Sequence, residues 1–378
     1  MLTKIKELKE KHNAIILAHY YQEPEIQDMA DFVGDSLELS RKAASTDADV
    51  ILFCGVHFMA ETAKIVNPGK KVIIPDMDAG CSLADSAPPK LFKQWVEKHP
   101  DHVVVSYINC SAEVKALSDI ICTSANAKKV VESIPKDKKI LFAPDKFLGK
   151  YIIKETGRDM VLWNGSCQVH EIFSEKELVK MKMKQPNAKV LAHPECDENI
   201  LMHSDFIGST SALINYVNRS DDKQFIIGTE PGVIHQMQKQ NPKKEFFPLP
   251  NQNGCACNEC PHMRLNTMEK IIQTLSSLKN EINLEGNILK IIFTPGHSPG
   301  HISFYNDAKG ILFSGDVIFK NSIGRTDLPG GNYETLLSSI KSKVLELPKN
   351  TIIHCGHGDS TSIKEEIISN PFLNCYLI

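Results

Sequence analysis

The chain has little that would direct it to a membrane or to nucleic acid. Its 378 residues contain no apolar run near the roughly 18 residues needed to span a bilayer. The apolar stretch at residues 14–18 is too short for the core of a signal peptide. The formal net charge of −3 provides no strong field to attract a polyanion or a charged surface. We therefore expect a cytoplasmic protein with no nucleic-acid and no membrane partner.

Cysteine, by contrast, is plentiful, with 11 residues. In a reducing cytoplasm these residues are not expected to form structural disulfides, so each is either a small buried apolar residue or a ligand. Six of them lie in or beside apolar runs, where burial is the simpler interpretation. The other five lie in turns rich in Gly, Ser and Asn, where ligation is the better interpretation: Cys81, Cys167, Cys255, Cys257 and Cys260.

An internal repeat organises about the first 260 residues. Apolar strands that end in polar groups begin near Ile15, Val103 and Val190, and a hydroxyl-rich turn that opens a helix follows each of them. Strand ends and turns recur at steps of 88 and 86 residues. Alternating strand and helix patterns favour parallel sheets with helices on both faces. We therefore predict an α/β protein with three pseudo-repeated αβα units around a central site.

Polar side chains at the carboxyl ends of parallel strands gather at one edge of the sheet, where α/β proteins place their sites. Glu195 is the candidate general base there, and Tyr21 and His19 are candidate proton carriers. Helix N-termini in the hydroxyl turns would bind carboxylates or phosphate, although a single such turn is usually only a cap. The candidates are, at strand ends, His19, Tyr21, Tyr107, Asn109, His193 and Glu195, and, in turns, Ser36, Ser124, Ser209 and Thr210.

Each unit also contributes a cysteine: Cys81, Cys167, and one of the cluster at residues 255–260. Three thiolates would leave one iron of an iron–sulfur cluster open to substrate, where it acts as a Lewis acid. Zinc is a rival because Cys257-x-x-Cys260 has ligand spacing, and a redox pair that includes Cys255 or Cys257 is another. The repeat spacing alone favours Cys255 as the third ligand.

Several of these motifs resemble those of the quinolinate synthase family, over residues 1 to about 280. They are His19-Tyr20-Tyr21-Gln22, Gly34-Asp35-Ser36, Tyr107-Ile108-Asn109, His193-Pro194-Glu195, Gly208-Ser209-Thr210 and Cys260-Pro261-His262-Met263. The resemblance implies condensation of iminoaspartate with dihydroxyacetone phosphate to quinolinate in NAD biosynthesis, with loss of phosphate and water. It also implies a functional link to an L-aspartate oxidase, which supplies iminoaspartate.

The resemblance further implies one 4Fe-4S cluster per chain, held by Cys81, Cys167 and Cys260, so the motif and the repeat spacing disagree about the third ligand. It implies catalytic roles for Glu195, Tyr21 and His19. Carried over by motif, the expected substrate-binding residues are His19, Ser36, Tyr107, Ile108, Asn109, Ser124, His193, Pro194, Glu195, Ser209 and Thr210.

The last hundred residues have a different character, because they are rich in strands. Thr294-Pro295-Gly296-His297, Ser314-Gly315-Asp316 and His354-Cys355-Gly356-His357 resemble the second half of a metallo-β-lactamase-fold hydrolase, in which His297, Asp316 and His357 match metal ligands. The H-x-H-x-D-H motif of the first half is absent from the chain. We expect an α+β half-sandwich that is not catalytically competent.

We accordingly expect units at residues 1–84, 85–170 and 171–285, the last with a closing helix, and a partial metallo-β-lactamase-like segment at 286–378. Two alternatives to a quinolinate synthase stay open at this point. One is an inactive or partly folded fusion, since the closing helix that begins near Leu265 is shorter than is usual in the family. The other is a metal-dependent hydrolase that acts through the C-terminal segment.

Overall fold

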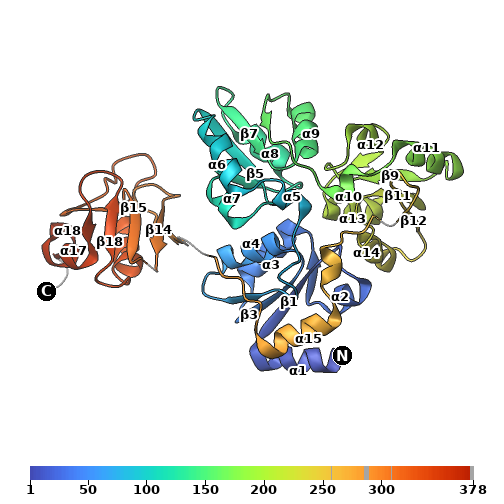
Figure 1. The fold of residues 1–378 in the computed structure, drawn as a ribbon. Coiled ribbons are helices and arrows are strands. Elements are labelled where there is room, and N and C mark those ends of the chain that lie inside the picture. Colours follow the sequence, from blue (N-terminus) through green and yellow to red (C-terminus); the bar gives the residue numbers. More distant parts are fainter. Residues whose placement is uncertain (257, 285–288, 308, 375–378) are drawn as a thin grey trace. The chain divides into compact units, whose positions relative to one another are not determined.

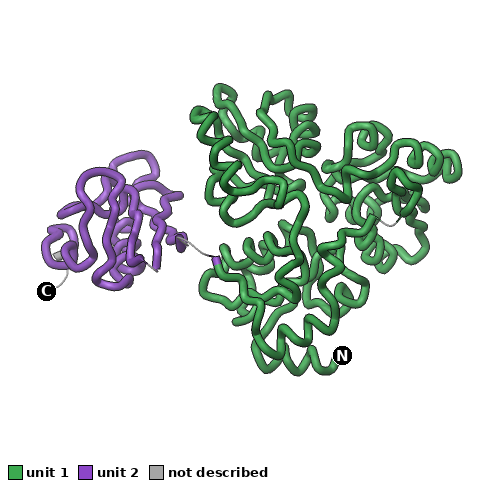
Figure 2. Tube along the Cα trace, in the orientation of Figure 1, with its two compact units in different colours: residues 1–283 green, residues 284–378 purple. Residues whose placement is uncertain are grey.

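The computed structural model of the chain describes residues 1–256, 258–284, 289–307 and 309–374. Two compact units divide the chain, residues 1–283 and residues 284–378 (Figure 2). The predicted boundary at residues 285 and 286 falls outside the described residues. Within the described part of the chain, no helix is both long and apolar enough to cross a membrane.

The first unit contains three four-stranded parallel sheets (Figure 1). Each sheet has the same order, with its second strand at one edge, then its first, third and fourth. The boundaries that we expected between the three sub-units stay a prediction, but the common strand order accounts for the repeat in the sequence. The strands are β1 (Ala14–His19), β2 (Phe32–Gly34), β3 (Val50–Cys54), β4 (Lys71–Ile73), β5 (His102–Tyr107), β6 (Ile120–Cys122), β7 (Lys139–Ala143), β8 (Val161–Leu162), β9 (Lys189–Ala192), β10 (Phe206–Ile207), β11 (Gln224–Gly228) and β12 (Glu245–Pro248).

Helices lie between successive strands, as parallel pairing requires. Because the central strands are buried on both faces, residues such as Leu52, Phe142 and Ile226 are almost fully inaccessible, which explains their unbroken apolar runs. The helices are α1 (Leu2–His12), α2 (Pro24–Met29), α3 (Ser36–Ser45), α4 (His57–Val66), α5 (Ser82–Asp85), α6 (Pro89–Glu97), α7 (Ala112–Ala116), α8 (Ala127–Ser133), α9 (Lys146–Thr156), α10 (Gln168–Glu171), α11 (Glu175–Lys184), α12 (Glu198–Met202), α13 (Thr210–Arg219), α14 (Val233–Gln240), η1 (Met263–Leu265) and α15 (Met268–Ser277).

The closing helix α15 packs against α1 and the first sheet (Figure 1). Its buried residues Ile271 and Leu275 share a core cluster with Leu8 of α1 and Ile16 of β1. After the helix, the Ile282 amide donates to the Val72 carbonyl over 2.8 Å, which adds a short antiparallel connection at the edge strand β4. Short as it is, the helix therefore completes the core of the first sheet.

The second unit is built on one mixed sheet of order β13-β14-β15-β18-β19. Helices cover one face, where Leu312 and Ile353 of the sheet share a core with Leu336 and Ile340. The elements are β13 (Lys290–Phe293), β14 (Ile302–Asn306), β15 (Ile311–Gly315), the β16–β17 hairpin (Ile318–Phe319 and Ser322–Ile323), α16 (Tyr333–Ser339), the π-helical turn η2 (Ile340–Val344), β18 (Ile352–Cys355), β19 (Thr361–Ser362), α17 (Ile363–Ser369) and α18 (Pro371–Asn374). This is the α+β half-sandwich that the sequence predicts.

Candidate active site

A cavity in the first unit collects side chains from all three sheets. The ends of β1, β5 and β9 supply polar groups to it, and so do the N-termini of α3 and α13. Of the residues predicted from the sequence, those that line the cavity are His19, Tyr21, Ser36, Cys81, Tyr107, Asn109, Ser124, Cys167, His193, Glu195, Thr210 and Cys260.

Three other predicted residues do not line the cavity. Ile108 and Pro194 are buried beside it, and the Ser209 hydroxyl accepts a hydrogen bond from the Ala212 amide as the cap of α13. Thr210, the first residue of that helix, is the one that reaches the cavity. A substrate contact by Ile108, Pro194 or Ser209 stays a prediction.

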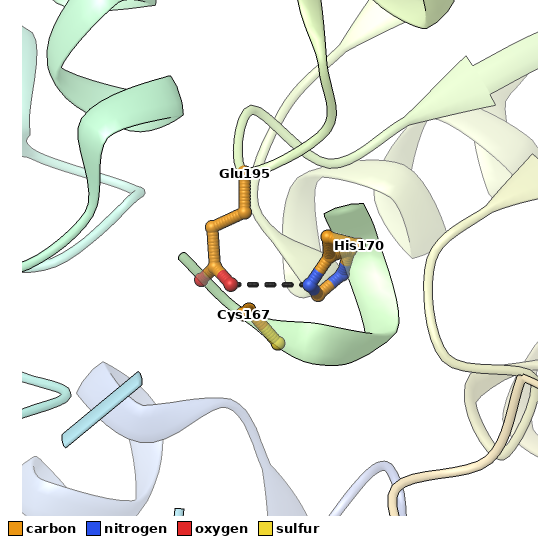
Figure 3. A group of neighbouring side chains, drawn as sticks. All are labelled: Cys167, His170 and Glu195. Atoms are coloured by element: carbon orange, nitrogen blue, oxygen red, sulfur yellow. Dashed lines mark ion pairs between the residues drawn. The ribbon is translucent and has the colours of Figure 1, made fainter. Parts of the chain in front are cut away.

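Glu195 is the buried carboxylate at the centre of the site. The Tyr107 hydroxyl donates to its Oε1 over 2.6 Å, and His170 Nδ1 lies 3.1 Å from its Oε2 (Figure 3). Burial alone would raise the pKa of this carboxyl, but the His170 and His193 rings and the Tyr107 hydroxyl lower it below its ordinary value. Glu195 is therefore held in its ionised form.

Two hydrogen bonds and one ion-pair contact connect Tyr21 to Glu195. The Tyr21 hydroxyl lies 2.8 Å from the Thr229 hydroxyl, which in turn lies 2.9 Å from His170 Nε2. With Nδ1 protonated against the carboxylate, Nε2 accepts from Thr229, as in a hydroxyl–imidazole–carboxylate triad. Burial raises the pKa of Tyr21 well above its usual value, so the phenol keeps its proton.

Thr229 and His170 were not among the residues predicted from the sequence. Thr229 directly follows β11, so it is also a strand-end residue, but only the first strand of each repeat was considered. His170 follows Cys167 by three residues within one turn of α10, which brings both side chains to the same side. Both signals were readable in the sequence.

The other two imidazoles are buried and neutral. Burial lowers the pKa of His19 and that of His193 to about 4. His19 Nδ1 accepts from the Tyr21 amide, and His193 Nδ1 accepts from the Glu195 amide, so each ring carries its proton on Nε2. In His193 that nitrogen lies 3.3 Å from the Ser124 hydroxyl. The two rings are thus fixed as neutral donors that face the cavity.

Three cysteine thiols line the same cavity, each near the start of a short helix. Cys81 caps α5, Cys167 caps α10, and the Cys260 carbonyl accepts from the Met263 amide at the start of η1. Burial raises the pKa of each thiol, while hydrogen bonds from two backbone N–H groups near each sulfur lower it. N–H groups aimed at sulfur favour the thiolate, the form that binds metal. The donor set fits a soft metal or a cluster.

The other cysteines of the 255–260 cluster are differently placed. Cys255 is disulfide-bonded, which contradicts the expectation of unpaired cysteines at this position, and it does not line the cavity. Cys260 does line the cavity, so the geometry favours the motif over the repeat spacing, and the choice of Cys260 as the third ligand stays a prediction. Cys257 lies outside the described residues. A separate group of possible metal ligands, Cys167, His170 and Glu195, has its atoms within 4.8 Å of one another (Figure 3).

Glu230 and Arg264 fasten the loop that carries Cys260. The fully buried Glu230 carboxylate accepts from the Cys260 amide and from Arg264, and Arg264 also donates to the Tyr21 carbonyl over 2.8 Å. Burial raises the pKa of Glu230 to about 8, although Arg264 opposes the shift. Through these bonds the position of Cys260 is coupled to the backbone of Tyr21.

Comparison with known proteins agrees with this geometry. The model of the family described as Quinolinate synthetase A protein matches residues 3–292. The chain belongs to the quinolinate synthase family. It is 62% identical over 280 residues to the quinolinate synthase of Synechocystis sp., covering 74% of this chain and 88% of the relative. It is 60% identical over 289 residues to that of Chloroherpeton thalassium, covering 76% and 90%. The alternatives of an inactive fusion or a hydrolase are not favoured.

The C-terminal part matches a second family model. That of the Metallo-beta-lactamase superfamily covers residues 232–357. Among solved structures, the BLEG-1 B3 metallo-beta-lactamase is 30% identical, covering 44% of this chain and 85% of that one, with a TM-score of 0.23. A reductase from Plasmodium falciparum is 10% identical, covering 74% of this chain and 93% of that one, with a TM-score of 0.30.

The second unit brings its predicted ligands only partly together. His297 Nε2 and His357 Nε2 each lie 3.6 Å from Asp316 Oδ2, and His297 Nδ1 bonds to the Arg325 carbonyl. The His357 side chain is 82% exposed. Among the described residues, the ligand atoms of these three side chains do not come close enough together to form a group that could hold a metal ion, unlike those of Cys167, His170 and Glu195.

Proposed function

We propose that this chain condenses iminoaspartate with dihydroxyacetone phosphate to quinolinate, using a 4Fe-4S cluster held by Cys81, Cys167 and Cys260. The observation that carries the proposal is the position of these thiols. All three line one cavity, Cys81 and Cys167 as the caps of short helices and Cys260 just before η1, and the cavity also contains the Glu195 carboxylate. The cluster would supply an open iron that acts as a Lewis acid toward a substrate oxygen.

The helix N-termini with hydroxyl side chains would bind the anionic groups of the substrates. Ser36 begins α3 and Thr210 begins α13, and both helices span ten residues, so the positive ends of their dipoles favour carboxylate or phosphate. Ser124 with His193 supplies a third donor pair. Because the chain has a formal net charge of only −3, these local donors must bind the anionic groups.

The Tyr21–Thr229–His170–Glu195 chain would move protons during condensation and dehydration. Glu195 orients His170 and stabilises its protonated form, and Thr229 passes the proton between the ring and the Tyr21 hydroxyl. Tyr107 keeps the other oxygen of Glu195 occupied. We propose this division of labour in place of direct proton abstraction by Glu195, because a carboxylate with a lowered pKa is a weak base.

Within the cell, we place this activity in de novo NAD biosynthesis, downstream of an L-aspartate oxidase. We further propose that the second unit has no hydrolytic activity of its own. Hydrolysis of a thioester or a β-lactam by the zinc-loaded chain, abolished by Asp316→Asn, would contradict this.

The test is anaerobic reconstitution with iron and sulfide, read by an iron count and by absorbance. We expect about four irons in the wild type and loss of the cluster in Cys260→Ala. Cys355→Ala, at a free thiol in the second unit, is the matched control and should keep its iron. A Cys260→Ala protein with a full cluster would contradict the ligand set, and a wild type without iron would contradict the cofactor.

A further inference from the structure

The sheet of the second unit exposes a continuous apolar face on the side away from its helices. Across neighbouring strands Ile291 pairs with Phe304, and Phe304 pairs with Phe313. Because side chains alternate between the faces of a sheet, these residues point to the same side, opposite the core that contains Leu312 and Ile353. The open sheet face consists of Ile291, Phe293, Ile302, Phe304, Phe313 and Ile352.

Each of these side chains is unusually accessible for a large apolar residue in a strand. The exposed fraction is 68% for Ile291 and 53% for Phe293, and at least 36% for the other four. Three Phe and three Ile exposed to this degree present on the order of 500 Å², near the upper end of the largest apolar patches on monomers. The sheets of the first unit leave no comparable run of exposed strand residues among those described.

We propose that two copies of this chain associate through the open sheet face. Paired face to face about a twofold axis, the two sheets would form a four-layer sandwich, with helices outside and the sheets stacked about 10 Å apart. Each copy then covers the apolar surface of the other, which is the arrangement that a half-covered sheet requires.

Charge and area both favour a second copy as the occupant. Lys290 is the sole Asp, Glu, Lys or Arg residue of β13, β14, β15 and β18, and it is paired with Asp307. A twofold pairing therefore brings no like charges of these strands together, and a nearby cation, Lys343 of η2, lies over the Phe293 ring with its Nζ 5.3 Å from the ring centroid. The apolar centre, extended at its margin by the 39% exposed Leu289, supplies more than half of the roughly 800 Å² that each partner buries in a standard interface.

His354 stacks against Phe313 at the centre of the open sheet face. The two rings are opposite each other across β15 and β18, with centroids 5.4 Å apart. Aromatic side chains with few rotatable bonds lose little entropy on association and are typical of interface centres. Phe304 and Phe313 are therefore the residues whose replacement should weaken the dimer most.

The experiment is sedimentation velocity on the full chain over a wide range of concentration. We expect the wild type to reach twice the mass of one chain, and Phe304→Lys to weaken association by at least about 30-fold, the effect of a central interface residue. Met183→Lys, at a 78% exposed position on α11 of the first unit, is the control for an added lysine and should associate like the wild type.

Ile291→Lys is the second test variant, in case Phe304→Lys does not fold. The Ile291 side chain is 68% exposed and therefore contributes little to the stability of the monomer. This variant should also weaken association, with an unchanged thermal unfolding transition and with increased binding of a dye that reports uncovered apolar surface. A wild type that stays monomeric at every concentration would overturn the proposal. So would a dimer that persists in both Phe304→Lys and Ile291→Lys, because another surface would then form it.

Discussion

The two units treat the faces of their sheets in opposite ways. In the first unit, helices cover both faces of three parallel sheets, and polar groups at the ends of strands from all three sheets line one cavity. In the second unit, helices cover one face of a mixed sheet, and the other face is apolar and exposed. Both units pack helices on sheets. The first unit thereby encloses a cavity with many candidate groups, whereas the second unit has an open sheet face and only some of the ligands that its family resemblance predicts.

The largest expected difference between the units concerns their two carboxylates. Glu195→Gln should reduce quinolinate formation by roughly 10³ to 10⁴-fold, as losses of triad carboxylates do, because the amide cannot stabilise a protonated His170. Asp316→Asn, the matched change in the second unit, should leave the rate unchanged. Steady-state assays with iron counts on both variants check this. Equal losses in the two would mean that the second unit takes part in the reaction.

The two cores should also respond separately to loss of packing. Leu275→Ala on α15 and Leu336→Ala on α16 each remove a fully buried side chain, at a cost of about 2 to 5 kcal/mol. Because the units have separate cores, scanning calorimetry should show that each variant lowers a different transition. A single transition that both variants lower equally would show one cooperative unit instead of two.

Thr229 tests whether the proton chain acts as a unit. Thr229→Val removes the hydroxyl between Tyr21 and His170 without much change in volume, and we expect about a 100-fold loss in kcat with the iron content kept. Thr229→Ser restores the hydroxyl and should recover most of the rate. A valine variant of normal activity would show that Tyr21 and Glu195 act independently.

The last prediction concerns the pH dependence of stability, where the effect is small for each unit of pH. The pKa of His19 is lowered to about 4 in the folded protein from 6.5, so the unfolded chain binds a proton more readily. Stability from this ring is present above pH 6.5 and is lost as the pH falls toward 4, at up to about 1.4 kcal/mol per pH unit. In His19→Asn, the free energy of unfolding, measured with denaturant, should depend less steeply on pH between these two values. An unaltered slope would mean that the ring is already solvated when folded.

Much of the first unit could be predicted from the spacing of a few residues. His19, Tyr107 and His193 recur in phase because each ends the first strand of a sheet with the same strand order. A constant spacing is kept in helices and strands because their rise per residue is fixed. The spacing therefore predicts which strand ends meet. It fails in the loop after β12, where Cys260, and not Cys255, lines the cavity.

Other features depended on contacts that spacing does not encode. Ser209 and Thr210 are adjacent, yet one caps α13 and the other reaches the cavity, because the first helical residue turns away from the cap. The link from Arg264 to both Glu230 and the Tyr21 carbonyl joins residues that are far apart in the chain. The absence of the H-x-H-x-D-H motif predicts that the second unit is a half-sandwich. The uniform apolar face of its sheet can be recognised only from the strand register.

The contact between α15 and α1 sets an order of events during synthesis. Leu8 leaves the ribosome early, but its partners Ile271 and Leu275 emerge more than 260 residues later. Until then the first sheet presents an unfinished hydrophobic surface, while the second and third sheets already have all their strands. The N-terminal sheet should therefore be the last part of the first unit to become protease-resistant on translating ribosomes. During synthesis, the residues that follow α15 then act as a spacer: they occupy the ribosomal exit tunnel, so that α15 emerges before the chain is released.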